Sequence, residues 1–154
     1  MPVPRTILVG TDFSDCSDLA LAQAVDIAAP LGATLHLVHA IAIPPIGIPE
    51  AGVAYGSMNV EAAAEIAQAA IDARADRNRD RVTLAPTCVE IGDPRDVIEN
   101  VARRIEADLI VIGTHGRRGI RRMLLGSVAE EVARTAPCPV LIVRPVDRPR
   151  TTSA

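Results

Sequence analysis

Glycine and arginine are concentrated in one stretch of the sequence, Gly113-Thr-His-Gly-Arg-Arg-Gly-Ile-Arg-Arg-Met-Leu-Leu-Gly-Ser127. Glycine lets backbone N–H groups approach a ligand closely, and guanidinium groups bind phosphate oxygens in pairs. The amides at a helix start add a further seat for an anion. In a chain whose formal net charge is only -3, so basic a stretch predicts a binding site for a phosphorylated ligand.

The spacing within this stretch brings glycine turns and a helix start close together. Gly113 and Gly116 follow an apolar run, and Gly126-Ser127 stands where a helical pattern begins. We expect Ser127 to cap that helix and to donate to a phosphate. A simpler interpretation stays open, in which these glycines only end a strand and start a helix. The basic residues of the stretch could likewise form an ordinary solvated surface: Arg117, Arg118, Arg121 and Arg122.

Asp12 and the three histidines are the other candidates for chemistry. Asp12 directly follows the first apolar run, where a carboxylate either caps the next helix or holds a ribose hydroxyl, and both interpretations stay open. His115 is expected to be structural or solvent-facing, because no serine or cysteine in a suitable context accompanies it. His36 and His39 face opposite sides of a predicted strand, so a shared metal is not expected.

Several classes of protein are excluded by residue types. All 16 basic residues are arginine, which excludes a P-loop lysine and Schiff-base chemistry. The first strand is followed by Gly10-Thr-Asp-Phe rather than a dinucleotide-binding GxGxxG. Gly116-Arg-Arg-Gly119 superficially matches the loop of RNA-binding KH modules, but a strand-like run precedes it where that module needs a helix. With Phe13 and Tyr55 the only aromatic residues, no nucleic-acid partner is expected.

Apolar runs separated by helical patterns predict the elements that hold these residues. Five strands are predicted, at Thr6–Gly10, Thr34–His39, Val82–Ala85, Asp108–Gly113 and Pro139–Arg144. Helices are predicted at 14–30, about 59–79, from Pro94 through Ile105, and from Gly126 to before Pro137. The segment 72–81 is interpreted as a solvated run of both charges. Because the strands are apolar on both sides, we expect parallel pairing under helices.

The expected fold class is α/β, a single-domain, open, doubly wound five-stranded parallel sheet with helices on both faces, Rossmann-like in its general plan. The domain is expected to span residues 1–145, followed by a disordered tail at 146–154. The cysteines lie far apart, and the uncharged segment 27–49 is broken by prolines and glycines. A strand-like run begins near the amino terminus without a signal pattern. We therefore expect inert thiols, a cytoplasmic location and no membrane association.

Three motifs in order resemble the universal stress protein family. They are Gly113-x2-Gly116-x9-Gly126-Ser127, then Thr11-Asp12-Phe13-Ser14 after the first strand, and Ala136-Pro-Cys-Pro-Val-Leu-Ile-Val-Arg144 near the end. The resemblance spans 5–144, and the glycine spacing is similar to that of the branch of the family that binds ATP. It implies a fold like that of the adenine nucleotide alpha-hydrolases.

The resemblance also implies a site and an assembly. Asp12 would hold the ribose, Gly10-Thr11 and the backbone near Ala40 would border adenine and sugar, and Mg²⁺ would arrive on the nucleotide. The remaining residues implied around ribose and phosphates are Gly113, Thr114, His115, Gly116, Arg117, Arg118, Gly126, Ser127 and Val128. The last strand, from Pro139 to Arg144, would pair with its copy in a homodimer.

The implied function is that of a cytoplasmic, ATP-binding regulator of the stress response, which acts through nucleotide-dependent conformation or through an unidentified protein partner. Asp12 and His115 are the only candidates for a general base, so we expect no catalytic residues and at most slow ATP hydrolysis. The alternatives are an adaptor without nucleotide, a sensor of AMP or cyclic AMP, and a slow ATPase. Segment 41–57 could form a lid or a partner surface. Alanine at Gly116 or Gly126 is expected to weaken ATP binding without changing the fold.

Overall fold

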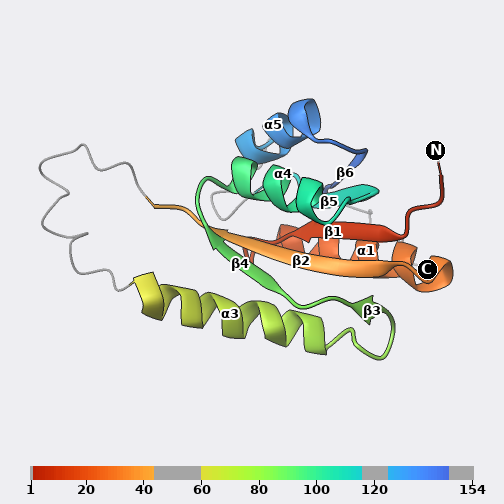
Figure 1. Ribbon diagram of the computed structural model, residues 1–154, viewed down its shortest axis with the longest axis horizontal. Helices are drawn as coiled ribbons and strands as arrows, with labels where there is room; N and C mark the ends of the chain where they lie inside the picture. Colours follow the sequence, from red (N-terminus) through yellow and green to blue (C-terminus); the bar gives the residue numbers. More distant parts are fainter. Residues whose placement is uncertain (1, 44–59, 116–124, 146–154) are drawn as a thin grey trace, which may run out of the picture.

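The computed structural model describes residues 2–43, 60–115 and 125–145 (Figure 1). Strands and helices alternate along these residues, as the sequence predicts, except that β3 and β4 follow one another directly. The elements are β1 (Thr6–Gly10), α1 (Asp15–Leu31), β2 (Thr34–Ile41), α3 (Val60–Asp76), β3 (Thr83–Leu84), β4 (Cys88–Ile91), α4 (Pro94–Arg104), β5 (Leu109–Gly113), α5 (Ser127–Thr135) and β6 (Val140–Val143). The predicted tail at 146–154 lies outside the described residues, so its disorder stays a prediction.

All the strands form one parallel sheet in the order β3-β2-β1-β5-β6, with β4 also paired with β2. From β1 the chain moves outward to β2, and from β5 it moves outward to β6 on the other side of β1. The sheet is therefore doubly wound, and its direction of winding reverses between β1 and β5. The predicted fold class is confirmed.

The third predicted strand is wrong in detail. Instead of one strand at 82–85, the structure has two short ones, β3 and β4, which pair with successive parts of β2. Pro86 lies between them, and proline has no N–H with which to continue a ladder. The sheet therefore has six strands in five positions, and the predicted number of five describes the positions only.

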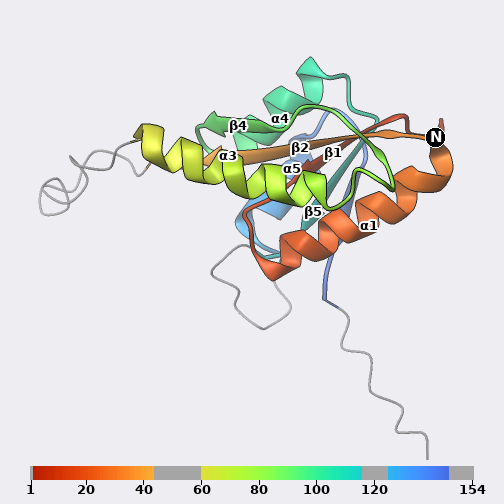
Figure 2. The same ribbon diagram turned by 90° about the horizontal axis from the view of Figure 1, so that it is seen from below.

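Side chains along each strand alternate between two apolar layers. Ile7 and Val9 of β1 pack toward α1 and α3, whereas Leu8 packs toward α4 and α5. Figure 2 shows α1 and α3 side by side on one face of the sheet. Both faces of the central strands are covered, which explains why their sequences are continuously apolar.

The first helix begins and ends where the sequence predicts. Ser14 is its N-cap, with a side chain that accepts a hydrogen bond from the amide of Ser17, and Gly32 ends it in the left-handed conformation at φ 63°. No helix among the described residues combines the length and the apolar character needed to cross a bilayer.

Candidate functional site

A cavity of about 540 Å³ lies at the carboxyl ends of β1 and β5, where the winding of the sheet reverses. Ligands of doubly wound sheets bind at such a point. It is lined by residues in the last parts of β1, β2 and β5, by residues that follow β1 and β5, by one residue of α1, and by the starts of α4 and α5: Gly10, Thr11, Asp12, Ser17, Val38, His39, Ala40, Pro94, Ile98, Ile112, Gly113, Thr114, His115, Leu125, Gly126, Ser127, Val128 and Ala129.

Most of the predicted site residues meet around this cavity. The structure brings together Gly10, Thr11, Asp12, Ala40, Gly113, Thr114, His115, Gly126, Ser127 and Val128. The others, Gly116, Arg117 and Arg118, lie outside the described residues, as do Arg121 and Arg122. The cavity is thus lined by residues that lie more than one hundred positions apart in the sequence, such as Gly10 and Ser127.

The start of α5 presents backbone donors to the cavity. Gly126 is the N-cap, and its carbonyl accepts the first hydrogen bond of the helix from the amide of Glu130, at 2.9 Å. The amides of Ser127, Val128 and Ala129 precede that bond and have no acceptor within the helix. All three residues line the cavity, so the positive end of the helix dipole faces it. The prediction that Ser127 caps this helix is wrong, because Gly126 occupies the cap position.

Gly126 and Gly113 are also packing residues. A Cβ on Gly126 would lie 2.6 Å from the carbonyl oxygen of Thr114, to which the Gly126 amide donates at 2.7 Å. A Cβ on Gly113 would lie 2.9 Å from the Cys16 sulfur. The start of α5 therefore sits directly on the residue after β5. We therefore expect alanine at Gly126 to cost stability as well as ATP affinity.

Asp12 is held at the edge of the cavity by the residue that caps α1. Its Oδ1 accepts hydrogen bonds from the amide of Ser14 at 3.0 Å and from the Ser14 hydroxyl at 2.5 Å. Since Ser14 is the cap, the capping interpretation of Asp12 is wrong. The carboxylate is instead fixed in a tight turn beside the cavity, a position suited to accepting a hydrogen bond from a ligand hydroxyl.

His115 brings a ring nitrogen without a partner to the site. Its Nδ1 lies 2.8 Å from the Thr114 hydroxyl, whereas its Nε2 is buried and makes no hydrogen bond within the described part of the chain. If the Thr114 hydroxyl donates to Nδ1, the neutral ring carries its proton on Nε2. A buried donor without an acceptor is costly, so a ligand oxygen that accepts from Nε2 gains affinity. The solvent-facing interpretation is therefore wrong for Nε2, while the His115 residue as a whole is half-buried.

The first turn of α4 forms a wall of the cavity that the sequence analysis did not assign. Asp93 caps this helix by accepting from the Arg95 amide at 2.9 Å, and the Arg95 guanidinium lowers the pKa of Asp93 to about 2. Pro94 and Ile98, which follow the cap, line the cavity. The signal was present in Gly92-Asp-Pro94, a helix start placed directly after a strand.

A cluster at the turn after β1 was not predicted from the sequence. It consists of Phe13, His39 and Arg74. The ring of Phe13 stacks on that of His39 with centroids 4.2 Å apart. The Arg74 guanidinium lies over the same Phe13 ring, with its Cζ 4.9 Å from the ring centroid. Arg74 belongs to the segment 72–81, yet its side chain is only 17% exposed. The interpretation of that segment as solvated is therefore wrong at Arg74.

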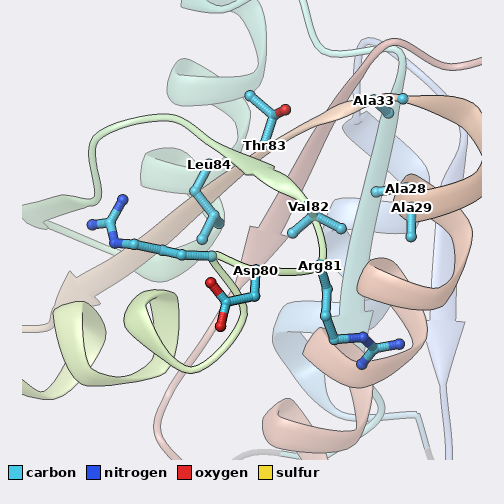
Figure 3. Close-up of a pocket in the computed structure, with 10 residues that line it drawn as sticks. Ala28, Ala29, Ala33, Asp80, Arg81, Val82, Thr83 and Leu84 are labelled. Carbon is cyan, nitrogen blue, oxygen red and sulfur yellow. The ribbon is translucent and has the colours of Figure 1, made fainter.

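A second hollow of about 480 Å³ lies between the end of α1 and the turn before β3 (Figure 3). Two of its lining residues are arginines, but Arg79 pairs with Asp76 at 2.6 Å and Arg81 pairs with Asp26 at 2.8 Å. Both ion pairs are more than half exposed, so their charges are already balanced in water. This hollow lacks the inward-facing donors of the cavity at β1 and β5.

The described residues contain no group of three or more histidine, cysteine, aspartate or glutamate side chains arranged to hold a metal ion. Cys16, Cys88 and Cys138 are free thiols. Burial raises the pKa of Cys88 and of Cys138, which disfavours the reactive thiolate. The polar groups of the cavity lining are one carboxylate (Asp12), two imidazoles (His39 and His115), several hydroxyls and the backbone amides at the start of α5.

Comparison with known proteins agrees with this arrangement. The chain is 35% identical over 143 residues to universal stress protein MJ0531 of Methanocaldococcus jannaschii, which covers 91% of this chain and 82% of that protein. Universal stress protein UspA from Lactobacillus plantarum superposes with a TM-score of 0.77 at 30% identity, over 90% of this chain and 97% of that one.

A third relative is a crystal structure of a universal stress protein in complex with cAMP, with a TM-score of 0.64 and 30% identity over 92% of this chain and 98% of that one. The profile of the universal stress protein family matches residues 4–144, which is nearly the whole chain. On this match and these relatives, the chain belongs to the universal stress protein family.

Proposed function

We propose that this chain binds ATP in the cavity between β1 and β5 and acts as a regulator of the stress response through the conformation or the partners that the nucleotide selects. One observation carries the proposal. The amides at the start of α5, which have no acceptor in the helix, line the same cavity as the Asp12 carboxylate. Amide donors and a fixed carboxylate in one cavity suit a ligand with a phosphate and a hydroxyl-bearing sugar.

Each group has a place in this binding mode. Asp12 accepts from a ribose hydroxyl, the amides of Ser127 and Val128 donate to phosphate oxygens, and Nε2 of His115 finds an acceptor. Arg117 and Arg118 follow His115 in the sequence and supply positive charge to the phosphates. Mg²⁺ arrives on the nucleotide and neutralises part of the triphosphate charge. In this binding mode Asp12 holds the ribose and His115 donates to a ligand oxygen, so neither serves as a general base, and we assign hydrolysis no more than an incidental role.

Cyclic AMP is the second candidate ligand, because a universal stress protein 30% identical to this chain has been crystallised with cAMP. The ribose and base of cAMP are those of ATP, so Asp12 and the adenine side of the cavity serve both ligands. They differ in the single cyclic phosphate, which has no terminal phosphates for Arg117 and Arg118 to contact.

Calorimetry with ATP-Mg²⁺, AMP, cAMP and adenosine tests the proposal. We expect ATP to bind with a micromolar dissociation constant, about -8 kcal/mol. At a thousandfold excess over that constant, ATP should stabilise the fold by about 4 kcal/mol. If millimolar ATP gave no binding heat and no rise in melting temperature, the proposal would fail, and the adaptor without nucleotide would replace it. Tighter binding of cAMP or AMP would favour the sensor, and mass spectrometry of nucleotide released from purified protein would identify the ligand independently.

We further propose a cytoplasmic homodimer that forms through β6. Free cysteines suit a reducing compartment. Within the described residues β6 pairs with β5 on one side and ends the sheet on the other. The Pro139 carbonyl accepts from the amide of Ile110 in β5, and the Val143 carbonyl accepts from the amide of Thr114, directly after β5. In this parallel ladder Leu141 therefore also faces β5, while Val140 and Ile142 point their amides outward. The outward amides are those that a second copy would bind.

The register of β6 identifies a substitution that should disrupt the proposed dimer and leave the fold of the single chain intact. Ile142→Pro removes an outward N–H and should convert the dimer to a monomer, whereas proline at Leu141 would break the ladder to β5. Light scattering at tens of micromolar should give twice the mass of one chain for the unmodified protein and one chain mass for Ile142→Pro. A dimer that survives Ile142→Pro, with unchanged circular dichroism, would place the interface elsewhere.

A further inference from the structure

Phe13, the residue after Asp12, has a backbone conformation that bulky residues rarely adopt. Its φ is 66°, in the left-handed region, where a side chain with a Cβ is strained. Such a conformation persists only when surrounding contacts hold it. Within the turn itself, the Phe13 amide donates to the Thr11 hydroxyl at 3.1 Å, and the Ser14 amide donates to Asp12. These local bonds set the turn but leave the Phe13 carbonyl and ring to be held from outside.

Arg74 holds both of those groups from a different element. Its Nη2 donates to the Phe13 carbonyl at 3.2 Å, and its Cζ lies 4.9 Å from the Phe13 ring centroid, within cation–π range. The ring is stacked on its other neighbour, His39, whose Nδ1 lies 2.8 Å from the Thr11 carbonyl. The turn after β1 is thus enclosed between α3 and β2.

Arg74 is itself fixed in place. Its Nε donates to Oδ1 of Asp18 at 2.7 Å, and its Nη2 donates to Oδ2 at 3.3 Å, a two-point contact with α1. It stands on α3 between Ile71 and Ala75, which are fully buried against the sheet. A guanidinium anchored this way has little freedom to leave Phe13.

We propose that Arg74 is a positioning residue for the nucleotide, which it never touches: it clamps Phe13 and thereby keeps the Asp12 carboxylate aimed into the cavity. This role rests on the proposed function, because that function supplies the nucleotide that Asp12 would bind. Arg74 does not line the cavity, but Asp12 and Ser14 flank Phe13, and the Ser14 amide and hydroxyl hold the Asp12 carboxylate. A turn that relaxes at Phe13 moves the Ser14 donors and so releases Asp12.

The clamp is tested first without any ligand, by amide hydrogen exchange. Arg74→Ala should accelerate exchange at Phe13 and Ser14 by about tenfold and leave the central strand amide of Val111 unchanged. Arg81→Ala is the matched control, because Arg81 also pairs with an aspartate of α1 but has no contact with Phe13. Arg74→Lys keeps a positive charge without the planar fork and should resemble Arg74→Ala. Unchanged exchange at Phe13 and Ser14, or equal acceleration in Arg81→Ala, would overturn the clamp.

A double-mutant cycle with ATP then tests the route through Asp12. Arg74→Ala should weaken ATP binding about tenfold in the unmodified background and by less than about twofold when Asp12→Asn is already present. A full tenfold loss in both backgrounds would show that Arg74 does not act through Asp12 and would overturn the proposal. If the unmodified protein binds no ATP, the proposed function fails instead, and the exchange experiment alone decides whether Arg74 holds the turn.

Discussion

Gly126→Ala is expected to lower the stability of the fold and the affinity for ATP together. The added Cβ would meet the Thr114 carbonyl oxygen at 2.6 Å, so backbone has to move at the point where α5 starts. Overpacking of this kind costs about 1–3 kcal/mol, which lowers the melting temperature of a 150-residue domain by roughly 2–12 °C. The same movement displaces the amides of Ser127 and Val128, and we expect at least about a tenfold loss of ATP affinity, equivalent to roughly 1.4 kcal/mol.

Gly32→Ala provides the matched control for loss of stability alone. Gly32 ends α1 at φ 63°, and a Cβ there would meet no atom within 4 Å. Alanine at this position costs about 1 kcal/mol from backbone strain, and Gly32 lies outside the cavity lining. Thermal melts should therefore show both variants destabilised, while calorimetry shows ATP affinity reduced in Gly126→Ala only. Unchanged ATP affinity in Gly126→Ala would contradict a phosphate seat at the start of α5.

Asp12→Asn is expected to weaken the binding of ATP and of adenosine by the same factor. Asparagine keeps an oxygen that can accept from the Ser14 amide, so the turn is retained, but it loses the charge and one acceptor. A hydrogen bond to a charged group contributes about 1.5–3 kcal/mol, so we expect a loss of roughly 10- to 100-fold for both ligands. Calorimetric titration of the two ligands gives the two factors directly.

Arg117→Ala is the complementary variant, because a guanidinium near the phosphates matters only to a ligand that has them. It should weaken ATP binding and leave adenosine unaffected. If Asp12→Asn weakened ATP but spared adenosine, Asp12 would act on the phosphates or the metal ion rather than on the ribose. Equal binding of both ligands in Asp12→Asn and in the unmodified protein would remove Asp12 from the site.

The central strands of the fold were predictable from local sequence pattern. The place where the loops after these strands meet was predictable as well. Continuous apolar runs gave β1, β2 and β5, and the reversal of winding brought Asp12, Gly113 and Ser127 to one cavity. The division of one strand position around Pro86 was missed because β3 is only two residues long, too short for a hydrophobic period to register.

Contacts between distant elements were not predictable from local pattern. Arg74 lies in a run of alternating charges that is typical of a solvated helix end, and only the packing of α3 beside α1 turns it toward Phe13 and Asp18. His115 gave no signal either, since the burial of its Nε2 depends on how the chain folds around it. Likewise, the close packing of Gly126 is evident only when the Thr114 carbonyl is placed beside it.

The break at Pro86 makes the two borders of the sheet unequal. On the β3 and β4 side the ladder is divided into short pieces, and Thr87 between them turns its hydroxyl to Gln68 and Asp72 of α3. A border of this kind is a poor template for another strand, whereas β6 offers an unbroken one. A sheet with two edges that can each pair with another chain can assemble head to tail into filaments. A sheet with one such edge can pair only with the same edge of a second copy, about a two-fold axis, and assembly then stops. In the proposed homodimer, the interruption at Pro86 therefore limits strand pairing to β6, and we expect assembly to stop at two copies.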